Sequence, residues 1–141
     1  MHNTFELKVL SPGKALPAIK AKSAVLPGTC GYMTILPDHA DMIAELDAGE
    51  IVIDAQGTSE HYFISGGYVE VDHNRVSVLA DTVEAAKDIN VAKAEEALKA
   101  AQAVLSNLTP ETDVEAANRE LKAAQARVQI ARGSSLAGAK H

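Results

Sequence analysis

Apolar and polar residues alternate with a period of two through residues 4–80 of the chain. The clearest examples are TFELKV at residues 4–9 and, further along, EIVID, HYFIS, YVEVD and RVSVL. Successive side chains of a strand point to opposite faces, so this alternation predicts strands that bury one face. About ten short strands with frequent turns and no helical stretch indicate a mainly β module, an antiparallel β-sandwich or flattened barrel.

Turn residues separate these strands. SPG at residues 11–13 and LPG at residues 26–28 are turn signals. YVEVD and RVSVL flank DHN, a short hairpin connection in which Asn74 is expected to take a left-handed conformation. Gly66 and Gly67 have strand on both sides, which favours a bulge or a close backbone approach over a phosphate-binding loop.

The period of the pattern changes after residue 81. Apolar residues then recur at alternating spacings of three and four, which predicts one helix in residues 88–108 and a second in residues 113–132. Alanine takes alternate positions of each apolar seam, so the two helices are expected to form a closely packed antiparallel hairpin that buries little area. The seam positions are Val91, Ala94, Leu98, Ala101, Leu105 and Leu108, then Val114, Ala117, Leu121, Ala124, Val128 and Ala131.

Capping residues predict where the two helices begin and end. Asp88 is expected to cap the first helix, and Thr109 to cap the second, with Pro110 at its first position. Gly133 and the two serines after it are expected to end the second helix, and the tail LAGAKH to fray.

The acidic charge is confined to the first module. Residues 1–87 hold 12 acidic and 6 basic side chains, whereas residues 88–141 hold 7 of each, so the whole net charge of −6 lies in residues 1–87. Together with the change of period, this division predicts a β-sandwich domain in 1–87 and a helical hairpin with a short flexible tail in 88–141. A net negative charge argues against a nucleic-acid partner.

The remaining features of the sequence indicate the cellular compartment and the relation of the chain to a membrane. Cys30 is the one cysteine, so the chain forms no internal disulfide, which fits a reducing compartment. The N-terminus MHNTFELKVL is too short and too polar for a signal peptide. Because no apolar run approaches about 18 residues, we expect any contact with a membrane to go through a partner.

ILPDHADMI at residues 35–43 places Asp38, His39 and Asp41 within four positions. Three roles are open for this trio: a metal site, acid–base catalysis, or a turn against another protein. The other histidines show no matching ligand spacing, and Pro37-Asp38 followed by Met42-Ile43 is simpler as a strand, a turn and the next strand. No nucleophile motif accompanies the trio, so a non-enzymatic chain without cofactor or metal is expected.

Two segments, GYMTILPDHADMIAELDAGEI and YFISGGYVEVDHNRVSVLAD, followed by two Ala-rich helices, resemble the epsilon subunits of the rotary (F-type) ATP synthase. The resemblance covers essentially the whole chain. It implies a ten-stranded β-sandwich and a helical hairpin in a non-catalytic subunit of the central stalk. The implied partners are the gamma subunit, the ring of c subunits and, through the extended hairpin, the catalytic alpha/beta head. It also implies a place at the cytoplasmic face of the bacterial inner membrane.

The same resemblance implies functions for the two modules. The sandwich would link gamma to the c ring and transmit torque, and the hairpin would either fold onto the sandwich or extend toward the head and inhibit ATP hydrolysis. Tyr32 would lie in a ring-facing loop, and Pro37, Asp38 and His39 in a turn beside the gamma and ring surface.

Two further sets of residues are assigned through the resemblance. Some members bind ATP through a motif that would correspond here to Ile89, Asn90, Lys93 and Ala94, in which Asn and Lys replace Asp and Arg. The lost carboxylate and the lost planar guanidinium predict that ATP sensing is degenerate. Basic residues of the second helix that would meet the head are Arg119, Lys122, Arg127 and Arg132.

Two other classes of protein remain open from the sequence. One is a free-standing β-sandwich binding module whose hairpin serves for dimerisation. The other is a small hydrolase that uses Asp38, His39 and Asp41.

Overall fold

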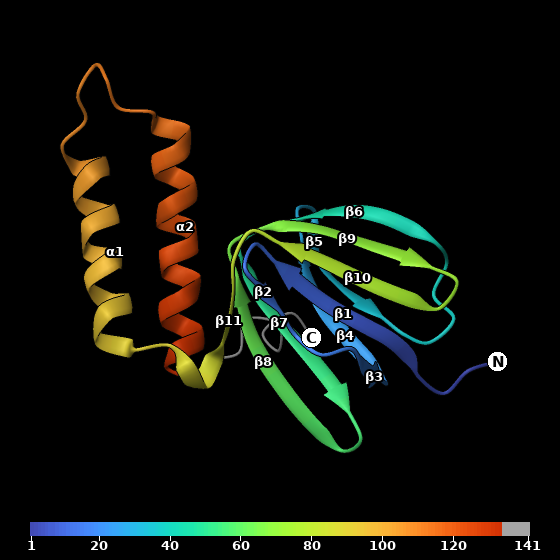
Figure 1. The fold of residues 1–141 in the computed structure, drawn as a ribbon. Helices are drawn as coiled ribbons and strands as arrows, with labels where there is room; N and C mark the ends of the chain where they lie inside the picture. Colours follow the sequence, from blue (N-terminus) through green and yellow to red (C-terminus); the bar gives the residue numbers. More distant parts are fainter. Residues whose placement is uncertain (134–141) are drawn as a thin grey trace.

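The computed structural model describes residues 1–133, which form eleven strands followed by two α-helices (Figure 1). This arrangement confirms the predicted β-sandwich followed by a helical hairpin. The strands are β1 (Phe5–Ser11), β2 (Lys14–Ala15), β3 (Ile19–Ala21), β4 (Ser23–Gly28), β5 (Gly31–Ile35), β6 (Met42–Leu46), β7 (Gly49–Ala55), β8 (Thr58–Ile64), β9 (Gly67–Asp72), β10 (Arg75–Ala80) and β11 (Val83–Ala85).

The strands join in one sheet that folds over itself, in the order β11-β8-β7-β4-β6-β9-β10-β1-β2, with β3 paired to β1 and β5 to β4. Within the described residues every pairing is antiparallel except that of β1 with β10. Figure 1 shows β6, β9, β10 and β1 in one layer and β7 and β8 in the other. The core lies between the two layers.

The predicted alternation decides which side chains enter this core. Phe5, Leu7 and Val9 of β1 are almost fully buried, whereas Glu6 and Lys8 between them are exposed. The same alternation holds along β9 and β10, whereas β7 buries Gly49, Glu50 and Ile51 in succession. The core is built almost entirely from aliphatic side chains. Because all of these residues belong to the sandwich, this core does not depend on the helices.

Local backbone geometry confirms two predictions from turn residues. His73 and Asn74 adopt φ values of 50° and 63° in the β9–β10 turn, which is the left-handed region expected for a tight hairpin. At Gly67 a Cβ atom would lie 2.1 Å from the carbonyl oxygen of Leu79. The adjacent glycines therefore permit a close approach between strands and do not lead into a helix, as a phosphate-binding loop would.

The helices begin later than the sequence predicted. A short 3-10 helix, η1 (Ala86–Asp88), contains Asp88, and α1 (Val91–Ser106) is capped by Asn90, whose Oδ1 accepts the Lys93 N–H at 3.0 Å. The assignment of Asp88 as the cap is wrong because the buried Ile89 extends the chain between η1 and α1.

The second predicted cap is also wrong. Helix α2 (Val114–Ala131) is capped by Asp113, which accepts the Ala116 N–H at 3.0 Å. Thr109 instead donates its own N–H to the Thr112 hydroxyl at 3.0 Å, forming a local turn in the connection between the helices. The end of α2 agrees with the prediction, because Gly133 follows it with a φ of 84°. The predicted frayed tail at residues 136–141 lies outside the described residues.

The hairpin packs on the sandwich through α2 rather than α1 (Figure 1). The predicted seam between the helices is buried at Ala94, Ala101, Ala117 and Val128. Its position Leu108 is exposed and lies beyond the end of α1, and Val114, its first position in α2, is also exposed. Helix α2 also has a second apolar face that the seam analysis missed. Ala126 and Ile130 of that face join Phe63 of β8 and Ile89 in a separate small cluster.

Candidate interfaces of the sandwich and the hairpin

Asp38 forms the corner of the turn that precedes β6. Its φ is 63°, and its N–H donates to Asn74 Oδ1 at 2.8 Å. Its carboxylate accepts the His2 main-chain N–H at 2.7 Å and lies 2.6 Å from His2 Nδ1. These two hydrogen bonds, led by the main-chain one, lower the pKa of the Asp38 carboxyl group below its usual value. Asp38 therefore ties the N-terminus to the β9–β10 turn.

The other two members of the trio bind elsewhere. His39 Nδ1 contacts the carbonyl oxygen of Ala40 at 2.8 Å, and Asp41 Oδ1 accepts the His73 main-chain N–H at 2.9 Å. The three side chains thus engage three different partners and share no reacting centre, which removes the basis for the hydrolase hypothesis. The His39 N–H donates to the carbonyl oxygen of Leu36 at 3.1 Å, which agrees with the predicted turn.

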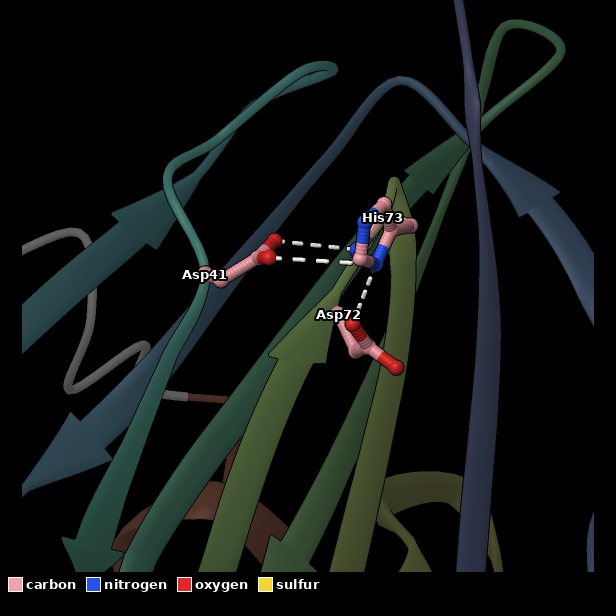
Figure 2. Close-up of side chains that lie close together, drawn as sticks. All are labelled: Asp41, Asp72 and His73. Atoms are coloured by element: carbon pink, nitrogen blue, oxygen red, sulfur yellow. Dashed lines mark hydrogen bonds and ion pairs between the residues drawn. The ribbon is translucent and has the colours of Figure 1, made fainter.

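A histidine and two carboxylates that the sequence analysis did not group lie close together beside this turn (Figure 2). His73 Nδ1 is 2.5 Å from Asp72 Oδ1 and 3.8 Å from Asp41 Oδ2. The hydrogen bond to Asp72 and then the charges of Asp72 and Asp41 raise the pKa of the His73 imidazole. Sequence spacing could not reveal this cluster, because only the pairing of Met42 with Val71 brings Asp41 beside the β9–β10 turn.

Tyr32 lies at the beginning of β5, next to the β4–β5 turn. Its side chain is half-buried, and its hydroxyl accepts the Glu50 N–H at 3.1 Å. Burial raises the pKa of this hydroxyl. Thr29 and Cys30, rather than Tyr32, are the exposed residues at the turn itself. The ring-facing position of Tyr32 stays a prediction.

The predicted interface residues occupy opposite ends of one strand. Tyr32 is the second residue of β5 and Pro37 lies two residues after its end, so the two are five positions apart along an extended segment. At about 3.3 Å per residue the two positions are about 17 Å apart. They therefore belong to two separate surfaces of the sandwich.

Three large apolar side chains are exposed on the outer face of the sandwich, and the sequence analysis did not single them out. Ile43 of β6 is 72% exposed, Tyr68 of β9 is 55% exposed and Leu79 of β10 is 53% exposed. Tyr68 and Leu79 are direct cross-strand partners, and Ile43 lies on the neighbouring strand that pairs with β9. We call these three residues the apolar face. The alternation along each strand predicts that these side chains point outward. That they lie near one another follows from the order of the strands in the sheet, which the alternation does not predict.

The basic residues of α2 mostly contact this chain itself. Arg127 holds Glu84 of β11 through two hydrogen bonds, 2.7 Å from Nε and 3.1 Å from an Nη atom. The hydrogen bond to Glu84 raises the pKa of the Arg127 guanidinium. Lys122 forms an ion pair with Asp47 of the β6–β7 connection. The pairs Arg127–Glu84 and Lys122–Asp47, which we call the latch, attach α2 to the sandwich.

The two other basic residues of this set, Arg119 and Arg132, form no ion pair with the described part of the sandwich. Arg132 contacts Glu95 of α1 at 2.7 Å and so joins the two helices of the hairpin. Arg119 is exposed on the part of α2 nearer its beginning. Their contact with a catalytic head stays a prediction.

The four residues of the degenerate ATP motif lie at the beginning of α1, where the hairpin joins the sandwich. Ile89 and Ala94 are buried in the cluster that joins α2 to the sandwich. Asn90 is the N-cap of α1, so its side-chain oxygen already has a hydrogen-bond partner, while Lys93 is exposed. Ile89, Asn90 and Ala94 therefore have structural roles within the chain, and the degeneracy of the ATP motif stays a prediction.

Two protein families match this chain, and the boundary between them coincides with the boundary between the sandwich and the hairpin. The family "ATP synthase, Delta/Epsilon chain, beta-sandwich domain" matches residues 4–86, and the family "ATP synthase, Delta/Epsilon chain, long alpha-helix domain" matches residues 87–132. The ATP synthase epsilon chain of Thioalkalivibrio sulfidiphilus is 36% identical over 132 residues, covering 92% of this chain and 94% of that one. This chain belongs to the ATP synthase epsilon family.

Members of the epsilon family are non-catalytic stalk subunits of a complex that serves ATP synthesis and ion transport. Another relative, the sodium-ion-specific epsilon chain of Propionigenium modestum, is 32% identical and covers 91% of this chain and 93% of its own length. A chain of the Euglena gracilis mitochondrial ATP synthase matches the fold with a TM-score of 0.72 at 17% identity, covering 100% of this chain and 84% of that one. Within residues 1–133, no helix combines the length and apolar character needed to cross a bilayer.

Proposed function

We propose that this epsilon-family chain links the gamma subunit to the c ring, transmits torque between them, and restrains ATP hydrolysis through its hairpin. The observation that carries this proposal is the division of the structure into a sandwich with its own core and a hairpin that joins it through a separate, smaller cluster. The chain would act as a peripheral subunit on the cytoplasmic face of a bacterial inner membrane, held there by its partners. The bacterial relatives support that location.

The apolar face is the proposed contact with gamma. Ile43, Tyr68 and Leu79 are exposed on three adjacent strands, and Glu45 and Glu70 are the register partners of Tyr68 and Ile43 on the same face. Exposed apolar side chains rimmed by polar ones mark protein interfaces on soluble domains. The turn that holds Pro37, Asp38 and His39 leads directly into β6, so it would border the same interface. The β4–β5 turn beside Tyr32, at the other end of β5, would meet the c ring.

Replacing Ile43 with Glu is expected to weaken gamma binding at least about tenfold. A carboxylate buried in an interface without a partner costs more than the roughly 1.4 kcal/mol to which a tenfold change corresponds. Titration of purified gamma with the full chain by calorimetry measures this effect. The control is Ser59→Glu, which adds the same charge at an exposed position of β8. Equal affinities for the two variants would place the gamma contact elsewhere.

The hairpin is the proposed inhibitory arm. In the folded position seen here, Lys122 and Arg127 are occupied by carboxylates of the sandwich. An extended hairpin would free both side chains to meet acidic groups of the catalytic head. The same basic residues would then stabilise either position, and the thin Ala-rich packing would keep the two positions close in free energy.

No saturable ATP binding is expected for the isolated chain at millimolar nucleotide. Asn90 lacks the carboxylate charge of the family motif, and Lys93 lacks the planar guanidinium that holds phosphate through two parallel hydrogen bonds. Calorimetry of the chain with ATP provides the measurement. The double change Asn90→Asp and Lys93→Arg should create binding, and Asp at position 90 keeps the N-cap. A micromolar site in the unchanged chain would refute this expectation.

A further inference from the structure

We propose that Asp41, Asp72 and His73 form a surface site for a divalent cation of the Zn²⁺ type. The site would lie at the β9–β10 turn, at the end of the sandwich away from the helices (Figure 1). The site adjoins the turn of Pro37, Asp38 and His39, but none of its three ligands belongs to the apolar face or to the latch.

The backbone brings the three ligands together from two segments. Asp72 ends β9 and His73 begins the turn, while Asp41 precedes β6, and the pairing of Met42 with Val71 aligns the two segments. One ligand atom from each side chain lies within 4.8 Å of the other two. Figure 2 shows both carboxylates directed at the imidazole ring.

The distances are close to those of a metal ligand set. Bond lengths of about 2.1 Å in a tetrahedral Zn²⁺ site place neighbouring ligand atoms about 3.4 Å apart. His73 Nδ1 lies 2.5 Å from Asp72 Oδ1 and 3.8 Å from Asp41 Oδ2, so the two separations lie on either side of that value. Small rotations of exposed side chains are therefore enough to accommodate the ion.

A main-chain hydrogen bond orients one of the ligands. The His73 N–H donates to Asp41 Oδ1 at 2.9 Å, which leaves Asp41 Oδ2 facing the imidazole. Outer hydrogen bonds of this kind fix the direction of ligating carboxylates in metal sites. Asp41 is thus positioned before any ion binds.

The ligand set determines the class of cation. One imidazole nitrogen with two carboxylate oxygens suits Zn²⁺ and similar transition-metal ions, whereas Mg²⁺ prefers oxygen ligands and retains its water shell. Two carboxylate charges also balance the charge of a divalent ion. Three protein ligands leave at least one position for water.

Neighbouring residues supply the controls. His2, Asp38 and His39 line a recess of about 510 Å³ that also includes Asp41 and His73. His39 contacts the carbonyl oxygen of Ala40 and is outside the three-ligand group. His39→Gln therefore removes one imidazole from the same surface without removing a proposed ligand.

The experiment is a Zn²⁺ titration of the full chain carrying Cys30→Ser, followed by calorimetry and by NMR of the histidine side chains. One saturable site is expected, with the His73 imidazole signals responding first. Asp41→Asn and His73→Gln should each raise the dissociation constant at least about tenfold, while His39→Gln leaves it unchanged. Mg²⁺ at the same concentration should not shift the His73 signals.

Two results would overturn the proposal. One is the absence of saturable Zn²⁺ binding to the full chain. The other is binding that survives His73→Gln but is lost in His39→Gln or His2→Gln, which would assign the ion to the neighbouring recess. Backbone spectra of each variant check that it is folded, and because all three ligands are exposed, the variants are expected to fold.

Discussion

An assembled enzyme that carries residues 1–87 in place of the full chain is expected to hydrolyse ATP about fivefold faster or more. Removing the hairpin removes the arm that would reach the catalytic head, and a restraint of only about 1 kcal/mol corresponds to a change of that size. ATP synthesis driven by an ion gradient should persist, because the sandwich keeps its own core and both proposed interfaces. Steady-state hydrolysis and gradient-driven synthesis, measured on the same preparation, test both parts.

A full-length chain with a pinned hairpin provides the matched control. Cysteines at Glu84 and Arg127, joined by a short bifunctional reagent in a Cys30→Ser background, would hold α2 on the sandwich where the latch holds it now. This enzyme should hydrolyse ATP as fast as the truncated one, because neither can place the hairpin at the head. Unchanged hydrolysis in both would show that the hairpin is structural rather than inhibitory.

Arg127→Ala is expected to shift the isolated hairpin toward the undocked position by about tenfold. The change removes two hydrogen bonds to the Glu84 carboxylate, and hydrogen bonds to charged groups contribute about 1.5–3 kcal/mol each when well shielded. The Arg127 and Glu84 side chains are 26% and 33% exposed, so solvent screening reduces the effect to about 1.4 kcal/mol. Because Arg127 is also a proposed contact with the catalytic head, this docking equilibrium is measured on the isolated chain.

Spin labels on the native Cys30 and on Thr109→Cys measure the position of the hairpin directly, because both sites are exposed. The full chain should give mainly one distance, and Arg127→Ala a second population. Arg132→Ala is the control, since Arg132 contacts Glu95 within the hairpin and not the sandwich. Identical distance distributions for the two variants would exclude the latch as the contact that holds the hairpin.

The strand pattern predicted the core because burial follows a period of two. Ile51 and Ile53 are buried, as are Phe5, Leu7 and Val9, each at the alternate position that the sequence indicates. The helix caps were harder to predict, because several side chains in each connection can act as caps. Asn90 caps α1 in place of Asp88 because the buried Ile89 is extended before the helix, and Asp113 caps α2 in place of Thr109, which belongs to a local turn with Thr112.

The surfaces were less predictable than the core. Exposure of Tyr68 and Leu79 follows the strand period, but their adjacency depends on the antiparallel register of β9 and β10. The second apolar face of α2, at Ala126 and Ile130, has a partner only because α2 packs on the sandwich. Contacts between segments distant in sequence, such as Asp41 with His73, need the strand order, which local patterns do not specify.

The most direct test of the account is whether residues 1–87 alone form a stoichiometric complex with gamma. Analytical ultracentrifugation of the two purified proteins, compared with gamma and the full chain, gives the stoichiometry and the affinity. The account predicts a one-to-one complex with an affinity within a few-fold of that of the full chain, because the apolar face belongs to the sandwich. Binding of gamma by the full chain but not by a folded 1–87 fragment would contradict it, since the hairpin would then be the part that joins the stalk.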